Sequence, residues 1–172
     1  MPKSLRKLTL AKQFSAIESI SVFGVSGGMG PIGLWTYAHA FEKSASVLSA
    51  SAVPFEPVRY YLICHSIELA LKAFLSLHGA TMLELSENAF GHNLQKILEV
   101  AESKGLSADV ALTPMHRAEI VSASAYYGGK VFEYPAVGEA MSGYPSLPQL
   151  EVLLDAGHVL VESLSKLCAE AP

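Results

Sequence analysis

The chain has 172 residues, enough for a single domain with a full hydrophobic core. Hydrophobic residues make up 51% of it and charged residues 16%, which excludes a disordered chain. The net charge is -4, but residues 1–12 hold four of the 12 bases and no acid, so residues 13–172 carry the remaining eight against all 16 acids. A globular part this acidic is a poor non-specific binder of nucleic acid, because phosphate neutralisation supplies most of that affinity.

Signals for a membrane or for secretion are weak in the sequence. No uncharged apolar run reaches the roughly 18 residues of a membrane span. Glu18 interrupts the apolar part of the basic N-terminal segment, unlike a signal peptide. Cys64 and Cys168 lie far apart and are interpreted as free thiols in a reducing compartment. We therefore expect a cytoplasmic protein that does not span a membrane.

Residues 1–33 are predicted to form an N-terminal extension outside the main domain. Helical periodicity over 5–23 is weak, and the segment from Gly24 to Gly33 is rich in glycine and contains Pro31. Such a segment also fits a phosphate-binding loop, but no clear strand precedes it and no Gly-Lys-Ser/Thr motif ends it. We therefore interpret it as a linker.

The rest of the chain shows helical periodicity and no convincing strand alternation. Pro57 suits the first turn of a helix, Gly79 ends that helix, and Pro114 either kinks a later helix or starts it. The expected helices are 34–50, 57–78, 92–105, 107–126 and 147–169, with a loop-like stretch between the last two. This pattern predicts an all-α, antiparallel four- to five-helix bundle over residues 34–169.

The helix that starts at Pro57 is apolar almost all round, which predicts a buried central helix. At about 100° per residue, one polar stripe interrupts the apolar surface within roughly 60° of arc. The stripe consists of Tyr61, His65, Glu68 and Lys72. A second histidine, His92, lies near the start of a later helix and can join it. The central helix therefore presents a base, an acid and an amine together.

Three interpretations of the stripe remain open. It is structural if Glu68 and Lys72 form a buried ion pair and the histidines cap carbonyls. It binds a ligand if the start of the helix after His92 leaves backbone amides open to an anion. It is catalytic if the carboxylate orients His65 as a general base on a ribose hydroxyl while Lys72 steadies phosphate charge.

Two further interpretations concern a metal site and the role of four tyrosines. His65, Glu68 and His92 lack the His-Glu-x-x-His spacing of a zinc site, so we expect no metal and no cofactor. Four tyrosines from the end of the fourth helix onward either stack a base or anchor a loop on the core. They are Tyr126, Tyr127, Tyr134 and Tyr144.

The order of these motifs resembles a known family, the HEPN-like helical domains of bacteria. The motifs that carry the resemblance are His65-Ser-Ile-Glu-Leu-Ala-Leu-Lys72, Gly91-His92-Asn93-Leu94 and Tyr134-Pro135. The similarity covers about residues 34–168 and implies a helical bundle that is often dimeric. In catalytic members it implies metal-independent RNA cleavage, frequently in toxin–antitoxin or phage-defence systems. Those members use an Arg and a His separated by four to six residues, a spacing that Arg59 and His65 have.

The resemblance leads us to expect a homodimeric binding or interaction protein, linked to nucleotide or RNA biology and without clear enzymatic activity. Its expected partners are a second copy, a nucleotide or RNA, and an antitoxin-like protein. The alternatives are a metal-independent endoribonuclease with Arg59 and His65 as catalytic residues, and a structural adaptor for a protein partner. The broad apolar surface of the last helix fits either a dimer interface or a buried helix. The expected ligand-binding residues are Tyr61, Glu68, Lys72, His92 and Tyr134.

Overall fold

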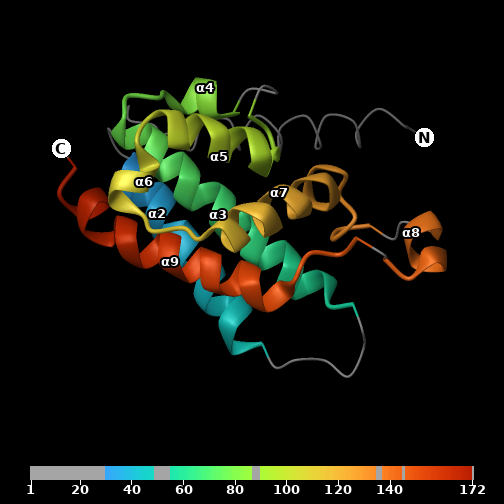
Figure 1. The fold of residues 1–172 in the computed structure, drawn as a ribbon. Helices are drawn as coiled ribbons and strands as arrows, with labels where there is room; N and C mark the ends of the chain where they lie inside the picture. The colour runs from blue at the N-terminus through green and yellow to red at the C-terminus, as the bar shows by residue number, and fades with distance from the viewer. Residues whose placement is uncertain (1–29, 49–54, 87–89, 135–136, 145, 172) are drawn as a thin grey trace, which may run out of the picture.

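The computed structural model describes residues 30–48, 55–86, 90–134, 137–144 and 146–171, and these residues contain helices and no strand. The prediction of an all-α helical bundle is thereby confirmed (Figure 1). The helices of ten or more residues are α2 (Pro31–Val47), α3 (Pro57–Leu77), α5 (Leu94–Ser103), α7 (Pro114–Gly128) and α9 (Leu150–Ala169). The shorter ones are α4 (Met82–Ser86), α6 (Leu106–Asp109) and α8 (Val137–Ser142). The segment 5–23, with its weak helical periodicity, and most of the predicted linker lie outside the described residues.

Prolines and capping residues set the helix boundaries. Pro31, Pro57 and Pro114 each occupy a first helical turn, where a missing N–H costs nothing. Pro114 therefore starts α7 and does not kink it. The Thr113 hydroxyl accepts from the backbone N–H of His116, and His116 Nδ1 accepts from the backbone N–H of Thr113, which closes a capping box.

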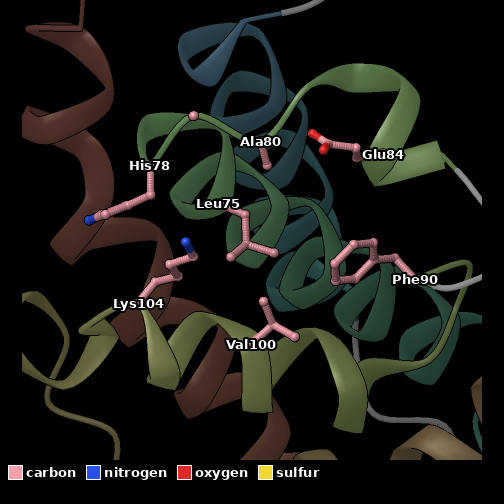
Figure 2. Close-up of a pocket in the computed structure, with 8 residues that line it drawn as sticks. Leu75, His78, Ala80, Glu84, Phe90, Val100 and Lys104 are labelled. Atoms are coloured by element: carbon pink, nitrogen blue, oxygen red, sulfur yellow. The ribbon is translucent and has the colours of Figure 1, made fainter.

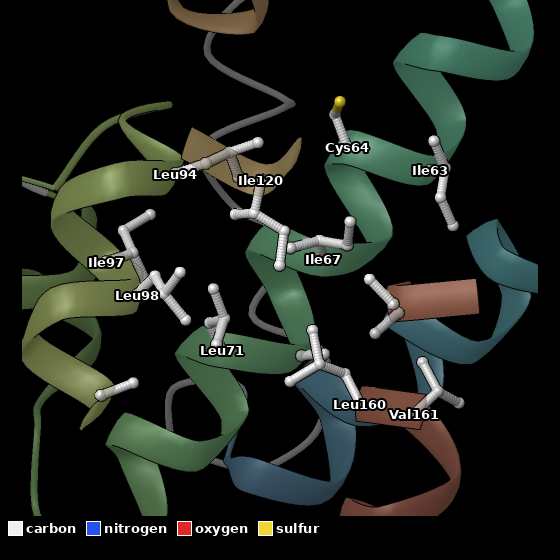
Figure 3. Close-up of a cluster of buried hydrophobic side chains, with 14 of the residues drawn as sticks. Ile63, Cys64, Ile67, Leu71, Leu94, Ile97, Leu98, Ile120, Leu160 and Val161 are labelled. Atoms are coloured by element: carbon white, nitrogen blue, oxygen red, sulfur yellow. The ribbon is translucent and has the colours of Figure 1, made fainter. Parts of the chain in front are cut away.

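Helix α3 is the centre of the bundle, as its apolar sequence predicts. It contacts all four of the other long helices, α2, α5, α7 and α9. Figure 3 shows side chains of α3, α5, α7 and α9 meeting in one hydrophobic core. Fully buried members of this core are Ile63, Ile67, Leu71, Leu94, Ile97, Ile120 and Leu160. By length and hydropathy α3 also passes as a membrane span, but 61% of its apolar window is buried inside the bundle, as in a core helix.

The helix directions are mixed, which differs from the predicted antiparallel arrangement. Helix α2 runs antiparallel to α3, and α7 runs antiparallel to α5 and α9 (Figure 1). Helix α3 runs parallel to α5 and to α9. Leu75 near its end and Val100 near the end of α5 line one cavity, while Tyr60 near its start donates to the carbonyl of Pro148 just before α9. The connection through α4 crosses back over the bundle and makes α5 parallel to α3.

One glycine allows α9 to approach α3 closely. A Cβ atom at Gly157 would overlap Cδ1 of Ile63 and lie 3.3 Å from its Cγ1. Ile63 is fully buried, so its side chain has little space to move away. The absence of a side chain at Gly157 is therefore a condition of the α3–α9 packing.

The segment after α7 is held to the core by aromatic contacts. Tyr144 stacks on Phe55 with ring centroids 4.2 Å apart. Phe132 stacks on Tyr60 at 5.0 Å and on Tyr126 at 5.9 Å. Of the four tyrosines noted in the sequence, Tyr126 and Tyr144 thus anchor this segment, and a stacking role for nucleic-acid bases is not needed to explain them.

Candidate functional site

Glu68 is the centre of a buried polar cluster on α3. Its side chain is only 3% exposed and lies about one helical turn from both His65 and Lys72. Lys72 Nζ donates to Oε1 of Glu68 at 2.6 Å and to the carbonyl oxygen of Gly91 at 3.2 Å. The buried ammonium and carboxylate therefore neutralise each other, and neither is left as a lone buried charge.

Residues from outside α3 complete the hydrogen bonding of the second oxygen, Oε2. The Tyr127 hydroxyl on α7 donates to it at 2.6 Å, and His92 Nδ1, just before α5, lies 2.9 Å away. His65 Nδ1 lies 2.8 Å from the Tyr127 hydroxyl oxygen and 3.5 Å from Oε2. We call His65, Glu68, Lys72, His92 and Tyr127 the Glu68 cluster.

The hydrogen bonds keep Glu68 ionised although it is buried. Burial by itself raises the pKa of a carboxyl group, but the neighbouring imidazole of His65 and the hydrogen bonds from Lys72, Tyr127 and His92 outweigh it. The pKa of Glu68 is lowered to about 2 as a result. Burial, reinforced by the charge of Glu68, raises the pKa of Tyr127, so the phenol keeps the proton that it donates.

The same contacts fix the tautomers of both histidines. An ionised carboxylate only accepts, so His92 must carry its proton on Nδ1 to donate to Glu68. The Tyr127 hydroxyl uses its single proton on Glu68, so its oxygen accepts from Nδ1–H of His65. Within the described part of the chain, Nε2 of neither imidazole has a hydrogen-bond partner. Each neutral ring therefore presents an Nε2 lone pair.

Aromatic side chains border the His65 end of the cluster. Tyr61, one turn earlier on α3, stacks almost parallel to the His65 ring, with centroids 5.8 Å apart and an interplanar angle of 12°. Phe41 on α2 meets the same imidazole edge-on at 4.5 Å. The His65 side chain is 22% exposed and that of His92 is 47% exposed, so both imidazoles reach solvent. The cluster therefore has a buried carboxylate and a partly exposed edge, which the aromatic rings of Tyr61 and Phe41 border.

The structure brings together most of the predicted site residues but not all. His65, Glu68, Lys72 and His92 form one network, and Tyr61 lies at its edge. Arg59 lies apart from His65: its guanidinium bonds the carbonyl of Ala45 at 3.3 Å and the Glu56 carboxylate at 3.1 Å, with Glu151 at 3.8 Å. Tyr134 is also apart from the cluster, with a 64% exposed side chain.

Tyr127 and Phe41 are the site residues whose roles sequence reasoning missed. The Tyr126-Tyr127 pair is visible in the sequence, but nothing in it distinguishes the two rings. In the structure the Tyr126 ring stacks on Phe132, whereas the Tyr127 hydroxyl donates to Glu68. Phe41 has an ordinary position on the core-facing side of α2, so its contact with His65 follows from how α2 packs on α3.

The described residues contain no group of three or more His, Cys, Asp or Glu side chains arranged to hold a metal ion. No protein-family model, curated protein or solved structure matches this chain. The resemblance to HEPN-like domains therefore stays a prediction from the motifs. The chemistry of the Glu68 cluster has to be inferred from its geometry.

Proposed function

We propose that the protein is a HEPN-like helical binding protein, without an enzymatic role, that binds a nucleotide over the Glu68 cluster. One observation carries the proposal: the cluster orients two partly exposed imidazoles through Nδ1, and Nε2 of His65 and of His92 has no hydrogen-bond partner among the described residues. The hydrogen bonding of the buried Glu68 carboxylate uses Nδ1 of His92 and the Tyr127 hydroxyl, and it does not require a free Nε2 on a partly exposed ring.

The chemistry of the partly exposed edge of the cluster favours a ligand that has both polar groups and an aromatic ring. A neutral imidazole Nε2 accepts from a ribose hydroxyl or a base amine, and a protonated one donates to phosphate. Tyr61 and Phe41 supply aromatic surface, on which nucleotide bases stack with little sequence preference. Lys72 offsets the charge of Glu68, so the carboxylate does not repel a phosphate group that binds beside the two imidazoles.

The endoribonuclease alternative has less support than the binding role. It needs a cation beside His65 to stabilise the charge that develops on phosphate. Arg59, the residue with the required spacing, is engaged by Ala45 and Glu56 on another side of α3. Within one chain, His65 therefore lacks the arginine on which that mechanism depends.

A homodimer and an antitoxin-like protein partner remain part of the proposal through the resemblance. Helix α9 does not present the broad apolar face that would suit a dimer, because Leu153, Leu160 and Leu164 are buried inside the chain. The apolar side chains of Leu48 (40% exposed) and Val58 (61% exposed) lie at adjoining ends of α2 and α3. Sedimentation analysis across a concentration series measures whether copies associate, and a constant monomer mass would contradict the dimer.

Isothermal titration with AMP, adenosine and inorganic phosphate tests the nucleotide site. We expect saturable binding of AMP, weaker binding of adenosine, and the weakest binding of phosphate, because only AMP offers both ring and phosphate. Replacing Tyr61→Leu should reduce AMP affinity by about five- to 150-fold, the range for one lost base stack. His92→Gln should reduce it by a few-fold to about tenfold, as for one hydrogen bond.

A matched control separates the site from general effects of losing a histidine. His158 on α9 has a 51% exposed side chain, close to the 47% of His92, and is not part of the Glu68 cluster. His158→Gln should therefore bind AMP as the wild type does. The proposal fails if the wild type does not bind AMP, or if His158→Gln and His92→Gln lose affinity equally.

A further inference from the structure

A concave site that contains no residue of the Glu68 cluster lies where the C-terminal ends of α3 and α5 converge. It is a surface cavity of about 290 Å³. Leu75, Phe90 and Val100 form an apolar lining (Figure 2). His78 and Lys104 lie at one end of it, and Glu84 lies toward the other. The cavity thus combines an apolar body with two ends of opposite charge.

At the basic end, the ammonium of Lys104 is the group that can pair with an anion. A carbonyl oxygen only accepts, so His78 Nδ1 donates its proton to the carbonyl of Phe74 at 2.9 Å, and this bond fixes the ring. Lys104 ends α5 through its backbone, while its ammonium makes no ion pair or hydrogen bond with any described residue. A cation at a helix C-terminus gains from the helix dipole, but it still lacks a direct anionic partner.

The opposite end disfavours a second anion. Glu84 is held at its place because Oε2 accepts from both the backbone N–H and the hydroxyl of Thr81, at 2.7 and 2.8 Å. These two hydrogen bonds, one from the backbone and one from the hydroxyl of Thr81, favour the ionised carboxylate and lower the pKa of Glu84. A ligand with negative charge at both ends would place one of them beside Glu84.

We propose that this cavity binds a small amphipathic monoanion, a molecule with one carboxylate and an apolar body. The carboxylate would pair with the ammonium of Lys104, and the apolar body would cover Leu75, Phe90 and Val100. The volume suits a body of about the size of one aromatic ring with a short chain. This site is separate from the nucleotide site and does not depend on it.

NMR titration with 3-phenylpropanoate tests the proposal, with 3-phenylpropylamine as a probe of similar body and opposite charge. We expect saturable amide shifts from the carboxylate probe that are largest at Gly79, Ala80 and Lys104, and weaker or no shifts from the amine. The proposal is overturned if neither probe gives saturable shifts at millimolar concentration. It is also overturned if the amine binds as tightly as the carboxylate.

Two variants and a control locate the binding. Lys104→Gln, at an exposed position, should weaken 3-phenylpropanoate binding about two- to fivefold, the range for one exposed charge pair. Ala80→Phe should block the cavity and abolish the shifts. Lys96→Gln removes an exposed lysine of the same helix that does not line the cavity, and it should bind as the wild type does. Equal losses in Lys96→Gln and Lys104→Gln would show general charge attraction and contradict a site in the cavity.

Discussion

Replacing Glu68→Gln removes the charge on which the whole cluster depends, and its cost should vary with pH. The pKa of Glu68 falls from 4.5 to about 2 on folding. At about 1.36 kcal/mol per unit, this shift contributes about 3 kcal/mol to the free energy of unfolding. A lowered pKa stabilises the fold fully above the unfolded value of 4.5, and the contribution is lost as the pH falls toward 2.

At neutral pH the variant should lose about 3 to 5 kcal/mol, because Lys72 is then buried without its anion. Urea unfolding at pH 7, 5.5, 4 and 2.5 measures the difference between the wild type and Glu68→Gln. That difference should stay constant from pH 7 to 5.5 and narrow by about 2 to 3 kcal/mol by pH 2.5. The other carboxylates are present in both proteins, so their contribution to the pH dependence of the free energy of unfolding cancels in the difference.

Glu99→Gln, at an exposed position on α5, is the control, and it should show little difference from the wild type at any of these pH values. A Glu68→Gln protein as stable as the wild type at pH 7 would refute the buried ion pair. A large difference that does not narrow in acid would refute the lowered pKa of Glu68.

Other parts of the structure give three further predictions. Gly157→Ala should destabilise the protein by up to about 2 kcal/mol in thermal unfolding, since overlap with Ile63 outweighs the better helix propensity of alanine. Adding Ile63→Val should recover part of that loss, and strictly additive costs would contradict the overlap. Thr113→Ala should cost about 0.5 to 2 kcal/mol through loss of the α7 cap, and an unchanged melting temperature would count against the capping box. Tyr127→Phe should cost about 1 to 3 kcal/mol, whereas Tyr37→Phe, at an exposed position, should be neutral.

Periodicity predicted the parts of the fold that local physics controls. An all-round apolar segment with Pro57 at its start and Gly79 after its end predicted a buried helix over 57–78, and α3 spans Pro57–Leu77. The same helical spacing placed His65, Glu68 and Lys72 on one face, as the hydrogen bonds now show. Both results follow from geometry within one helix.

Relations between helices were harder to predict. The direction of α5 relative to α3 depends on the crossover through α4, which helical periodicity does not specify. For the same reason, the sequence did not show that Tyr127 reaches Glu68 across 59 positions of the chain. Arg59 had the right spacing to His65 in the sequence, but residues six apart on a helix differ by about 120° in direction.

The most direct test of the account is the protonation of the two imidazoles, measured by two-bond ¹H–¹⁵N correlation spectra of ¹⁵N-histidine protein at neutral pH. We predict that neutral His65 and His92 carry their proton on Nδ1, and that Nε2 of both rings shifts on titration with AMP while that of His158 does not. Protons on Nε2 in the free protein would contradict the hydrogen bonding of the Glu68 cluster. If the tautomers are as predicted but Nε2 of neither ring shifts on addition of AMP, the cluster is a structural network and the nucleotide site is contradicted.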